Sequence, residues 1–406
     1  MSWPMIPVSE LCEFAVDCVN KTAPTVEHET EFKMIRTTNV KGGFIDLREV
    51  RFVTEEVFNK WTRRSRPQYG DVILTREAPV GEVGRFTSND EKVFLGQRLF
   101  HYRPDPNKLD WNFLAYALQS PQIQGKFKGM GFGATVDHVR VGDAERLPIP
   151  CPPINVQKRI GDTLSAYDDL IENNRRRIQL LEQSARLLYK EWFVHLRFPG
   201  HEHTLIINGV PESWEKKHLS QIFNTQYGFT ESATNDPVGP KFLRGTDINK
   251  TSYIDWSAVP YCPDEKLDFQ KYKLQIDDIL VIRMADPGKV AIVETEEKAV
   301  FASYLIRLTR KPGIEIPALY LFYVLASDQY QGFISGASGG STRKSANAKL
   351  VVDFVTLIPT ASLSQLFTTK IQPMRQQIQT LLQQNANLRK ARDLLLPKLM
   401  NGEMAV

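Results

Sequence analysis

The sequence predicts a mixed α/β (α+β) fold in which two copies of one module are separated by two long helices. Three observations carry this prediction: an internal repeat, a heptad pattern of apolar residues after each copy, and the order of these elements along the chain. The 406 residues are enough for two or three domains, each with its own core. With 42% hydrophobic and 24% charged residues, the composition is that of a globular protein.

The internal repeat is visible as blocks that return in register. The stretch 71–76 (DVILTR) returns as 278–283 (DILVIR), an offset of 207 residues (278 minus 71). The stretch 33–40 (KMIRTTNV) returns as 241–248 (KFLRGTDI). At the offset of 207, residues Leu114, Tyr116, Leu118, Ser120, Gln122, Gly125, Gly133 and Thr135 recur as Leu321, Tyr323, Leu325, Ser327, Gln329, Gly332, Gly340 and Thr342. Such a series indicates a duplication.

Each copy has the residue pattern of a small mixed α/β module. Apolar, β-branched runs at 71–75 and 278–282, followed by a glycine turn, predict a buried strand that runs into a hairpin. Residues 111–118 and 318–325 predict buried helices whose aromatic side chains belong to the core. Glycine-rich stretches at 129–135 and 336–342 predict loops that either contact a nucleic-acid backbone or serve as flexible connections. Neither loop has the lysine of a nucleotide-binding P-loop.

Each copy is followed by an apolar heptad seam. The seams predict helices from about residue 155 to 194 and from about 363 to 396, each on the order of 50 to 60 Å long at about 1.5 Å per residue. Pro373 predicts a kink near the start of the second helix, and Asn385 a polar position that fixes the register. The predicted pairing residues are Leu164, Ile171, Ile178, Leu181 and Leu188 in the first seam and Ile371, Ile378, Leu381, Leu388 and Leu395 in the second.

The order of elements predicts how the helices pair. The second copy follows the end of the first helix almost at once and directly precedes the second helix, so the second helix has to run back. We therefore expect an antiparallel coiled coil with a pseudo-two-fold relation between the modules. The predicted domains are residues 1–150 for the first module, 151–198 for the first helix, 199–358 for the second module and 359–406 for the second helix.

Basic residues occupy comparable places in the two copies and are candidates for contacts with DNA. Arginine can donate to N7 and O6 of guanine, and lysine neutralises phosphate. Arg76 and Arg283 flank the same turn and are the strongest single candidates, with a structural ion pair as the alternative. The full set is Arg36, Lys41, Arg76, Arg98, Lys126, Lys128, Thr135, Arg140, Arg244, Lys250, Arg283, Lys289, Thr342, Arg343, Lys344 and Lys349.

No motif for catalysis or for a bound cofactor stands out. The chain lacks the motifs of amino-methyltransferases and dinucleotide-binding proteins, and its four cysteines match no zinc or redox spacing. Asp71 with 90–92 (DEK), and Asp278 with 296–298 (EEK), leave open a standalone Mg²⁺-dependent DNA nuclease. A helical scaffold that binds no DNA is the other alternative. No apolar stretch reaches the roughly 18 residues of a membrane span, and no secretory signal is visible, so we expect a cytoplasmic protein without a membrane partner.

Two stretches make the chain resemble the specificity subunits of type I restriction-modification systems. They are residues 147–154 (LPIPCPPI), with Gln157 leading into the first helix, and residues 394–403 (LLLPKLMNGE). The resemblance covers essentially the whole chain. The family often has Glu-Gln before this helix, where the present chain has Val156-Gln157, and the second copy has Ile358-Pro359-Thr360 in place of the double proline. Both departures weaken the transfer of individual partner contacts.

The resemblance implies a function that the residues alone do not define. Two target-recognition domains would each read one half of a split site in double-stranded DNA, and the helices would set the gap between the halves. Because the two copies share few loop residues, the site is expected to be asymmetric. Two methylation subunits would dock on the helices, and restriction subunits would join them. The chain itself is expected to catalyse nothing and to bind no cofactor, whereas the complex would use S-adenosylmethionine, ATP and Mg²⁺.

Overall fold

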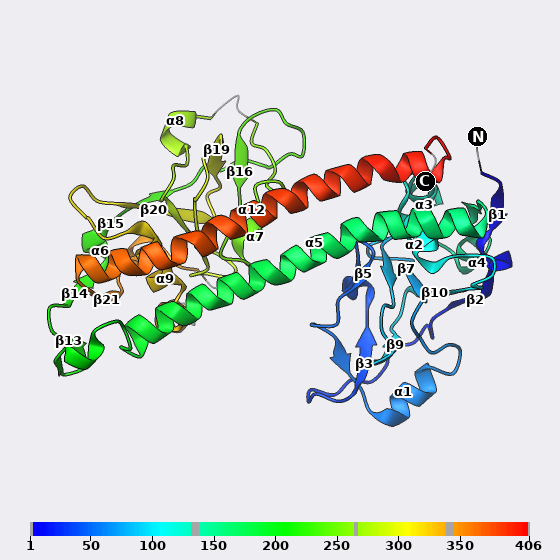
Figure 1. Ribbon diagram of the computed structural model, residues 1–406, viewed down its shortest axis with the longest axis horizontal. Coiled ribbons are helices and arrows are strands. Elements are labelled where there is room, and N and C mark those ends of the chain that lie inside the picture. Colours follow the sequence, from blue (N-terminus) through cyan, green and yellow to red (C-terminus); the bar gives the residue numbers. More distant parts are fainter. Residues whose placement is uncertain (1–2, 131–137, 264–266, 338–344, 405–406) are drawn as a thin grey trace. The chain divides into compact units, whose positions relative to one another are not determined.

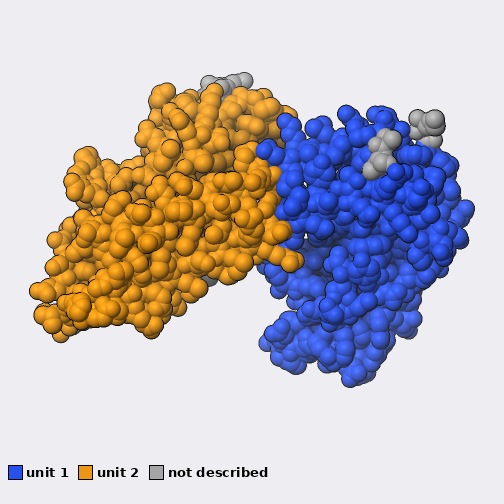
Figure 2. Space-filling view, in the orientation of Figure 1, with its two compact units in different colours: residues 1–172, 387–406 blue, residues 173–386 orange. Residues whose placement is uncertain are grey.

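The computed structural model describes residues 3–130, 138–263, 267–337 and 345–404 (Figure 1). The chain folds into two compact units, residues 1–172 with 387–406 and residues 173–386 (Figure 2). Each unit combines one module with part of both long helices. Within the described ranges, no helix is both long enough and apolar enough to cross a membrane.

The first unit is built around a four-stranded antiparallel sheet with the order β2-β10-β7-β8. Its central strand, β7, is buried along its whole length, as its apolar, β-branched sequence predicts. A three-stranded sheet, β6-β3-β9, lies beside it, with β3 and β9 parallel. The strands are β1 (Met5–Pro7), β2 (Cys12–Asp17), β3 (Phe32–Ile35), β4 (Val40–Lys41), β5 (Phe44–Ile45), β6 (Arg51–Phe52), β7 (Val72–Thr75), β8 (Val83–Arg85), β9 (Lys92–Leu95), β10 (Leu99–Pro104) and β11 (Pro148–Pro150).

The second unit repeats this topology. Its four-stranded antiparallel sheet has the order β15-β20-β17-β18, and β16 pairs with β19 in parallel, as β3 pairs with β9. The duplicated mixed α/β fold that the sequence predicts is therefore confirmed. The strands are β12 (Ile206–Ile207), β13 (Val210–Pro211), β14 (Glu215–His218), β15 (Phe223–Tyr227), β16 (Lys241–Leu243), β17 (Ile279–Ile282), β18 (Val290–Ile292), β19 (Ala299–Phe301), β20 (Leu305–Arg310) and β21 (Val355–Ile358).

Short helices complete each module. In the first unit they are α1 (Glu55–Trp61), α2 (Trp111–Gln119), α3 (Pro121–Met130) and α4 (Val141–Glu145), and in the second α6 (Leu219–Ile222), α7 (Gly245–Ile248), α8 (Phe269–Tyr272), α9 (Ala318–Ala326), α10 (Asp328–Ala337) and α11 (Ala348–Val351). The predicted core helices are present as α2 and α9, and their aromatic side chains are buried. Asp110 caps α2 by accepting a hydrogen bond from the backbone N–H of Phe113.

The first residues of the predicted glycine-rich loops belong to helices. Gly129 and Met130 belong to α3, and Gly336 and Ala337 belong to α10. A glycine lowers the stability of a helix by only about 1 kcal/mol relative to alanine, so a helix that is otherwise stable can include it. Residues 131–137 and 338–344 lie outside the described residues.

The two long helices are α5 (Ile154–Tyr189), which continues as the π-helical segment η3 (Lys190–Val194), and α12 (Ala361–Met400). The first agrees with its predicted range. The second is longer than predicted, because it continues through Pro397. It also contains Pro373 as one continuous element. A proline removes one helical N–H donor. Ile371 and Met374, on either side of Pro373, pack into the core of the second unit, and this packing holds the helix there.

The two helices run antiparallel in each unit. In the second unit, Ile178 packs with Ile378 and Leu381, and the Nδ2 atom of Asn174 donates to Oδ1 of Asn385 at 3.0 Å. In the first unit, earlier residues of α5, such as Leu164, pack in one cluster with later residues of α12, from Leu395 to Met400. Higher numbers on α5 therefore meet lower numbers on α12, and the predicted antiparallel pairing is confirmed. Of the predicted pairing residues, Leu164, Ile171, Ile178, Ile371, Ile378 and Leu381 are buried, and Leu181, Leu188, Leu388 and Leu395 are partly buried.

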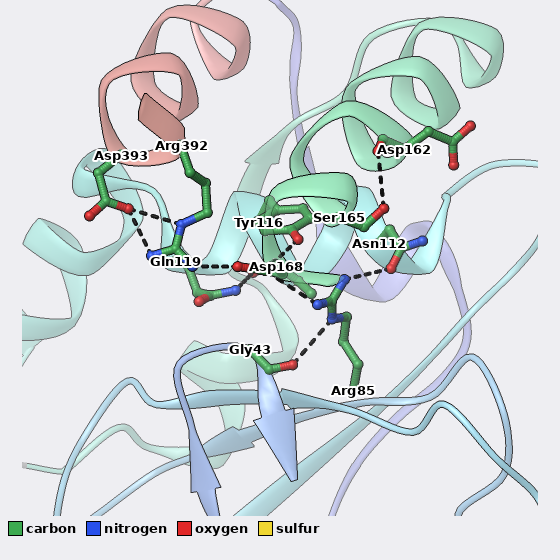
Figure 3. A network of polar contacts seen from close by, with 11 residues as sticks. Gly43, Arg85, Asn112, Tyr116, Gln119, Asp162, Ser165, Asp168, Arg392 and Asp393 are labelled. Carbon is green, nitrogen blue, oxygen red and sulfur yellow. Dashed lines mark hydrogen bonds and ion pairs between the residues drawn. The ribbon is translucent and has the colours of Figure 1, made fainter. Parts of the chain in front are cut away.

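A buried ion pair joins the helices to the module in the first unit. Asp168 of α5 accepts from the hydroxyl of Tyr116 in α2 at 2.6 Å and lies 3.4 Å from Nη2 of Arg85 in β8. Its other oxygen accepts from Nη1 of Arg392 in α12 at 2.5 Å. The side chains of Arg85 and Asp168 are only 3% and 2% exposed. Figure 3 shows Asp168 between these three partners, so one carboxylate connects both helices with the sheet and α2.

The second unit has an ion pair at the equivalent position with the charges exchanged. Arg375 of α12 lies 207 residues after Asp168 (375 minus 168), and Tyr323 corresponds in the same way to Tyr116. Nε and Nη2 of Arg375 donate to the two carboxylate oxygens of Glu294 at 2.7 and 2.6 Å. The Arg375 side chain is 2% exposed. Burial raises the pKa of Tyr323 to about 12, so this tyrosine stays neutral beside the ion pair.

Removal of the Asp168 carboxylate should destabilise the first unit strongly. Asp168→Ala would leave the buried guanidinium of Arg85 without its charge partner, which costs roughly 3–5 kcal/mol in comparable sites. The neighbouring Asp169 is exposed, so Asp169→Ala removes the same charge from the helix surface and should change stability by less than about 0.5 kcal/mol. Urea unfolding of both variants measures the difference, and equal midpoints would contradict the role assigned to Asp168.

Candidate nucleic-acid interface

Four of the eight predicted DNA contacts of the first unit lie between helices and strands, on segments that meet at one end of the four-stranded sheet: Arg36, Arg76, Arg98 and Arg140. The turn after β7, the residue before β10 and the segment after residue 137 are tied together by their backbones. Arg76 N–H donates to the carbonyl of Arg98 at 2.8 Å, and Val139 N–H donates to the carbonyl of Arg76 at 2.9 Å. The side chain of Thr37, after β3, donates to the carbonyl of Ala78 at 2.9 Å. Loops from four parts of the sequence thus form one surface, which we call the loop cluster.

The second unit forms the same loop cluster from equivalent residues. Arg283 N–H donates to the carbonyl of Tyr304 at 2.9 Å, and Ala346 N–H donates to the carbonyl of Arg283 at 2.8 Å. These two hydrogen bonds correspond one by one to those of Arg76. The two loop clusters therefore share a backbone framework, on which different side chains are displayed.

The turn after β7 and the turn after β17 each contain an alanine with a positive φ angle. Ala78 and Ala285 have positive φ angles of 47° and 69°, a region that non-glycine residues rarely adopt. Behind each turn a glutamine side chain holds the chain in place: Nε2 of Gln124 donates to the carbonyl of Gly81 at 2.9 Å, and Nε2 of Gln331 to that of Gly288 at 2.7 Å. Such strain persists only where the surroundings enforce it, and it is concentrated at functional sites.

The basic candidates of the first unit lie in different surroundings. Arg76 is 7% exposed, and its Nη1 donates to the carbonyl of Val139 at 3.1 Å. Its guanidinium thus has a structural partner, a carbonyl rather than the carboxylate of the predicted alternative. Arg98 is exposed and pairs with Glu77 at 2.9 Å. Lys41, Lys128 and Arg140 are exposed, Arg36 and Lys126 are partly buried and donate to the carbonyls of Glu49 and Pro148, and Thr135 lies outside the described residues.

The candidates of the second unit divide in a similar way. Arg244 makes two hydrogen bonds to the carboxylate of Asp247, at 3.2 and 2.9 Å. Arg283 lies over the ring of Tyr227, with its guanidinium carbon 4.9 Å from the ring centroid. Lys250, Lys289 and Lys349 are exposed, whereas Thr342, Arg343 and Lys344 lie outside the described residues. Which of these side chains contact DNA stays a prediction.

Two exposed tyrosines, Tyr227 and Tyr304, belong to this surface and are absent from the sequence-based candidates. Most aromatic residues of the chain are buried, as expected, so composition alone does not separate these two from core residues. The repeat does contain a signal that could have identified Tyr304. Tyr304 stands where the first copy has Arg98, one of the predicted contacts, but the offset has changed by one residue there, from 207 to 206 (304 minus 98).

The carboxylates that suggested a nuclease are engaged in separate structural contacts. Asp71 lies 2.8 Å from Nη2 of Arg103 and 2.7 Å from Nε2 of His101. Asp278 lies 3.3 Å from Nη1 of Arg307. Within the described ranges, no group of three or more His, Cys, Asp or Glu side chains lies close enough together to hold a metal ion. The geometry offers no Mg²⁺ site at these residues.

The two equivalent aspartates differ in their electrostatics. Burial raises the pKa of each, but at Asp71 the hydrogen bonds from Arg103 and His101 outweigh burial and hold the pKa below its usual value. At Asp278 burial prevails over the weaker contact with Arg307, so the pKa is raised. Ionised Asp71 therefore adds stability above its unfolded pKa, and this contribution is lost as the pH falls through the folded pKa. Asp278 contributes in the opposite sense, because its stabilising effect decreases as the pH rises through its raised pKa.

Comparison with known proteins gives consistent matches. Residues 2–183 match the family model described as the type I restriction modification DNA specificity domain. The MjaIX specificity subunit of a type I restriction enzyme from Methanocaldococcus jannaschii is 25% identical over 383 residues, which cover 88% of this chain and 82% of that protein. The EcoBI specificity subunit from Escherichia coli is 23% identical and covers 78% of this chain and 70% of its own. The crystal structure of the type I restriction-modification S subunit from M. genitalium has a TM-score of 0.57 at 19% identity, covers 98% of this chain and 96% of its own, and therefore shares its fold.

Substitution of the two aspartates should separate their roles. Asp71→Asn weakens the charged contacts with Arg103 and His101, so we expect the free energy of unfolding at pH 7 to fall by about 2 kcal/mol. Asp278→Asn removes a charge that burial disfavours, so its loss should be smaller. Urea unfolding between pH 3 and pH 7 measures both effects. The Asp71→Asn variant should also lose less stability on acidification than the wild type, and a steeper acid loss would contradict the assigned pKa direction.

Proposed function

We propose that this chain is a type I restriction-modification specificity subunit that recognises a DNA target, and that its two modules each read one part of a divided, asymmetric DNA site. The observation that carries this proposal is the repeated loop cluster. Arg76 and Arg283 have the same backbone partners, yet the residues beside them differ, with Arg98 in one unit and Tyr304 in the other. Two readers of one fold with different side chains favour two different half-sites.

The physical basis of the proposal is the addition of base contacts. A well-placed contact with a base edge contributes roughly 1–3 kcal/mol of discrimination, so a few in each half-site produce high selectivity. Exposed lysines on the loop clusters, such as Lys41 and Lys289, would add sequence-independent affinity through phosphate contacts. Because α5 and α12 run through both units, we propose that their length sets the number of base pairs between the half-sites.

We propose that the chain itself catalyses nothing and acts through partner subunits. Two methylation subunits would dock on the helices, restriction subunits would join them, and the complex would use S-adenosylmethionine, ATP and Mg²⁺ in the cytoplasm. Exposed leucines on α5 support a docking role for the helices. Leu180 and Leu187 are one heptad apart and each is 62% exposed, and exposed apolar side chains in such a row fit a protein interface.

The two alternative functions are not favoured. A standalone nuclease would need carboxylates that converge on a metal ion, whereas Asp71 and Asp278 are each engaged with basic side chains. A scaffold that binds no DNA would not need a pair of loop clusters that share their backbone contacts and carry exposed lysines.

Exchange of one module should change only one half of the target. If residues 1–150 are replaced by the corresponding module of another specificity subunit, the methylated sequence should change in one half-site and keep the other half and the gap. Replacement of residues 199–358 is the matched experiment and should change the opposite half. Sequencing of methylated positions in cells that carry each hybrid reads the result. A change in both halves after either exchange would refute independent reading by the modules.

A further inference from the structure

Three residues of the second unit form a compact group at the loop end of its four-stranded sheet. Tyr227 is the last residue of β15, Arg283 directly follows β17, and Tyr304 directly precedes β20. The strand register brings them together, because Tyr227 pairs with Ile306 and Ile282 pairs with Leu305 on the shared neighbour β20. We call Tyr227, Arg283 and Tyr304 the tyrosine–arginine cluster.

The exposure of the two tyrosines is unusual for this chain. Among the aromatic side chains that the structure describes, those more than a third exposed are Tyr69, Tyr227 and Tyr304, at 55%, 42% and 58%. Tyr69 lies before β7, at the opposite end of the first module's sheet, and its ring packs on Trp111 with 5.1 Å between centroids. The ring of Tyr304 makes no ring contact or hydrogen bond with a described residue. An aromatic surface left open to solvent fits a partner with flat, stackable faces.

The cluster is fixed in position although it is exposed. The Tyr227 hydroxyl accepts a hydrogen bond from the backbone N–H of Ala348 at 2.9 Å, so the ring is held at both ends. Arg283 lies over this ring at 4.9 Å, within the range of a cation–π contact. The Nε atom of Arg283 is buried and has no hydrogen-bond partner among the described residues. The ring therefore orients the guanidinium. Because Nε is buried, the Nη atoms are the donors that could reach a ligand, and they make no hydrogen bond to a described residue.

The equivalent place in the first unit has a different chemistry. Strand pairing makes Asp17 the counterpart of Tyr227, because Asp17 ends β2 and pairs with Phe100 as Tyr227 pairs with Ile306. Asp17 pairs with Arg64 at 2.5 Å, and Arg98, the counterpart of Tyr304, pairs with Glu77. The first unit thus presents charged pairs where the second unit presents two tyrosines around an arginine.

We propose that the tyrosine–arginine cluster determines part of the base sequence read by the second module. In this proposal, which rests on the proposed function, Arg283 donates to the edge of a guanine and Tyr304 packs against the neighbouring base. Tyr227 is a positioning residue that holds the guanidinium. Arginine is suited to this role, because its planar fork of donors matches N7 and O6 of guanine, and an aromatic ring offers apolar contact to a base or to the methyl group of thymine.

The test is selection of sequences from a library of DNA duplexes by the full-length chain and its variants. Arg283→Lys keeps the charge and loses the fork, so overall affinity should be retained while discrimination at one base position falls by roughly 5- to 150-fold. Tyr304→Ala should relax an adjacent position. Tyr227→Ala should reproduce the effect of Arg283→Lys, whereas Tyr227→Phe keeps the ring and should keep most of the selectivity. Tyr69→Ala removes an exposed tyrosine elsewhere and should select the wild-type sequence.

All expected changes lie in one half of the selected sequence, while the other half stays as in the wild type. Unchanged selection by Arg283→Lys and Tyr304→Ala would overturn the proposal, and so would an equal loss of affinity for every sequence, which indicates phosphate contacts only. Thermal unfolding of each variant verifies that the second unit is folded. If the wild-type chain selects no divided sequence at all, the proposed function itself fails, and this outcome is distinct from a divided sequence that the variants do not alter.

Discussion

The structure depends on one interaction that occurs in each unit, a buried ion pair that joins the long helices to the module. In the first unit the helix supplies the carboxylate of Asp168, and the sheet supplies Arg85. In the second, the helix supplies Arg375, and Glu294, just after β18, supplies the carboxylate. A neutral, buried tyrosine lies beside each pair. These charges are removed from water, so each buried charge is tolerated only when its partner is in place. The ion pair therefore defines the position of the module on the helices within each unit.

Because the charges are exchanged, the contact between helix and module is chemically different in the two units. Positions 168 and 375 are equivalent in the repeat, yet they carry opposite charges. A module with an arginine at its contact would bring two like charges together if it packed against Arg375. The opposite holds at the loop end of each module. There the backbone framework is the same in both units, held by Gln124 and Gln331, while the displayed side chains differ. A fixed contact between module and helices, combined with variable side chains on the loops, is what modular sequence recognition requires.

Much of this architecture follows from the sequence in physical terms. The repeat, the core helices and the antiparallel direction of α5 and α12 are predictable, because apolar periodicity and connectivity leave few arrangements. The end of α12 is not, because Pro397 signals a stop that packing around Leu396 and Leu399 overrides. The burial of Arg76 cannot be predicted either, because an arginine after a strand has the same sequence pattern whether it faces solvent or the carbonyl of Val139. The buried ion pairs cannot be predicted from the sequence, because their partners are far apart along the chain and the two copies carry opposite charges at the equivalent helix position.

We propose that the contacts between each module and the antiparallel helices hold two DNA-reading modules at a fixed separation. The most direct measurement is the affinity of the full-length chain for duplexes whose two half-sites are moved apart one base pair at a time. A single preferred separation is predicted, with affinity lower by roughly tenfold or more at the neighbouring separations, because only one half-site can then be engaged fully. Equal affinity over several separations would contradict the claim, since it would mean that the modules move independently of the helices.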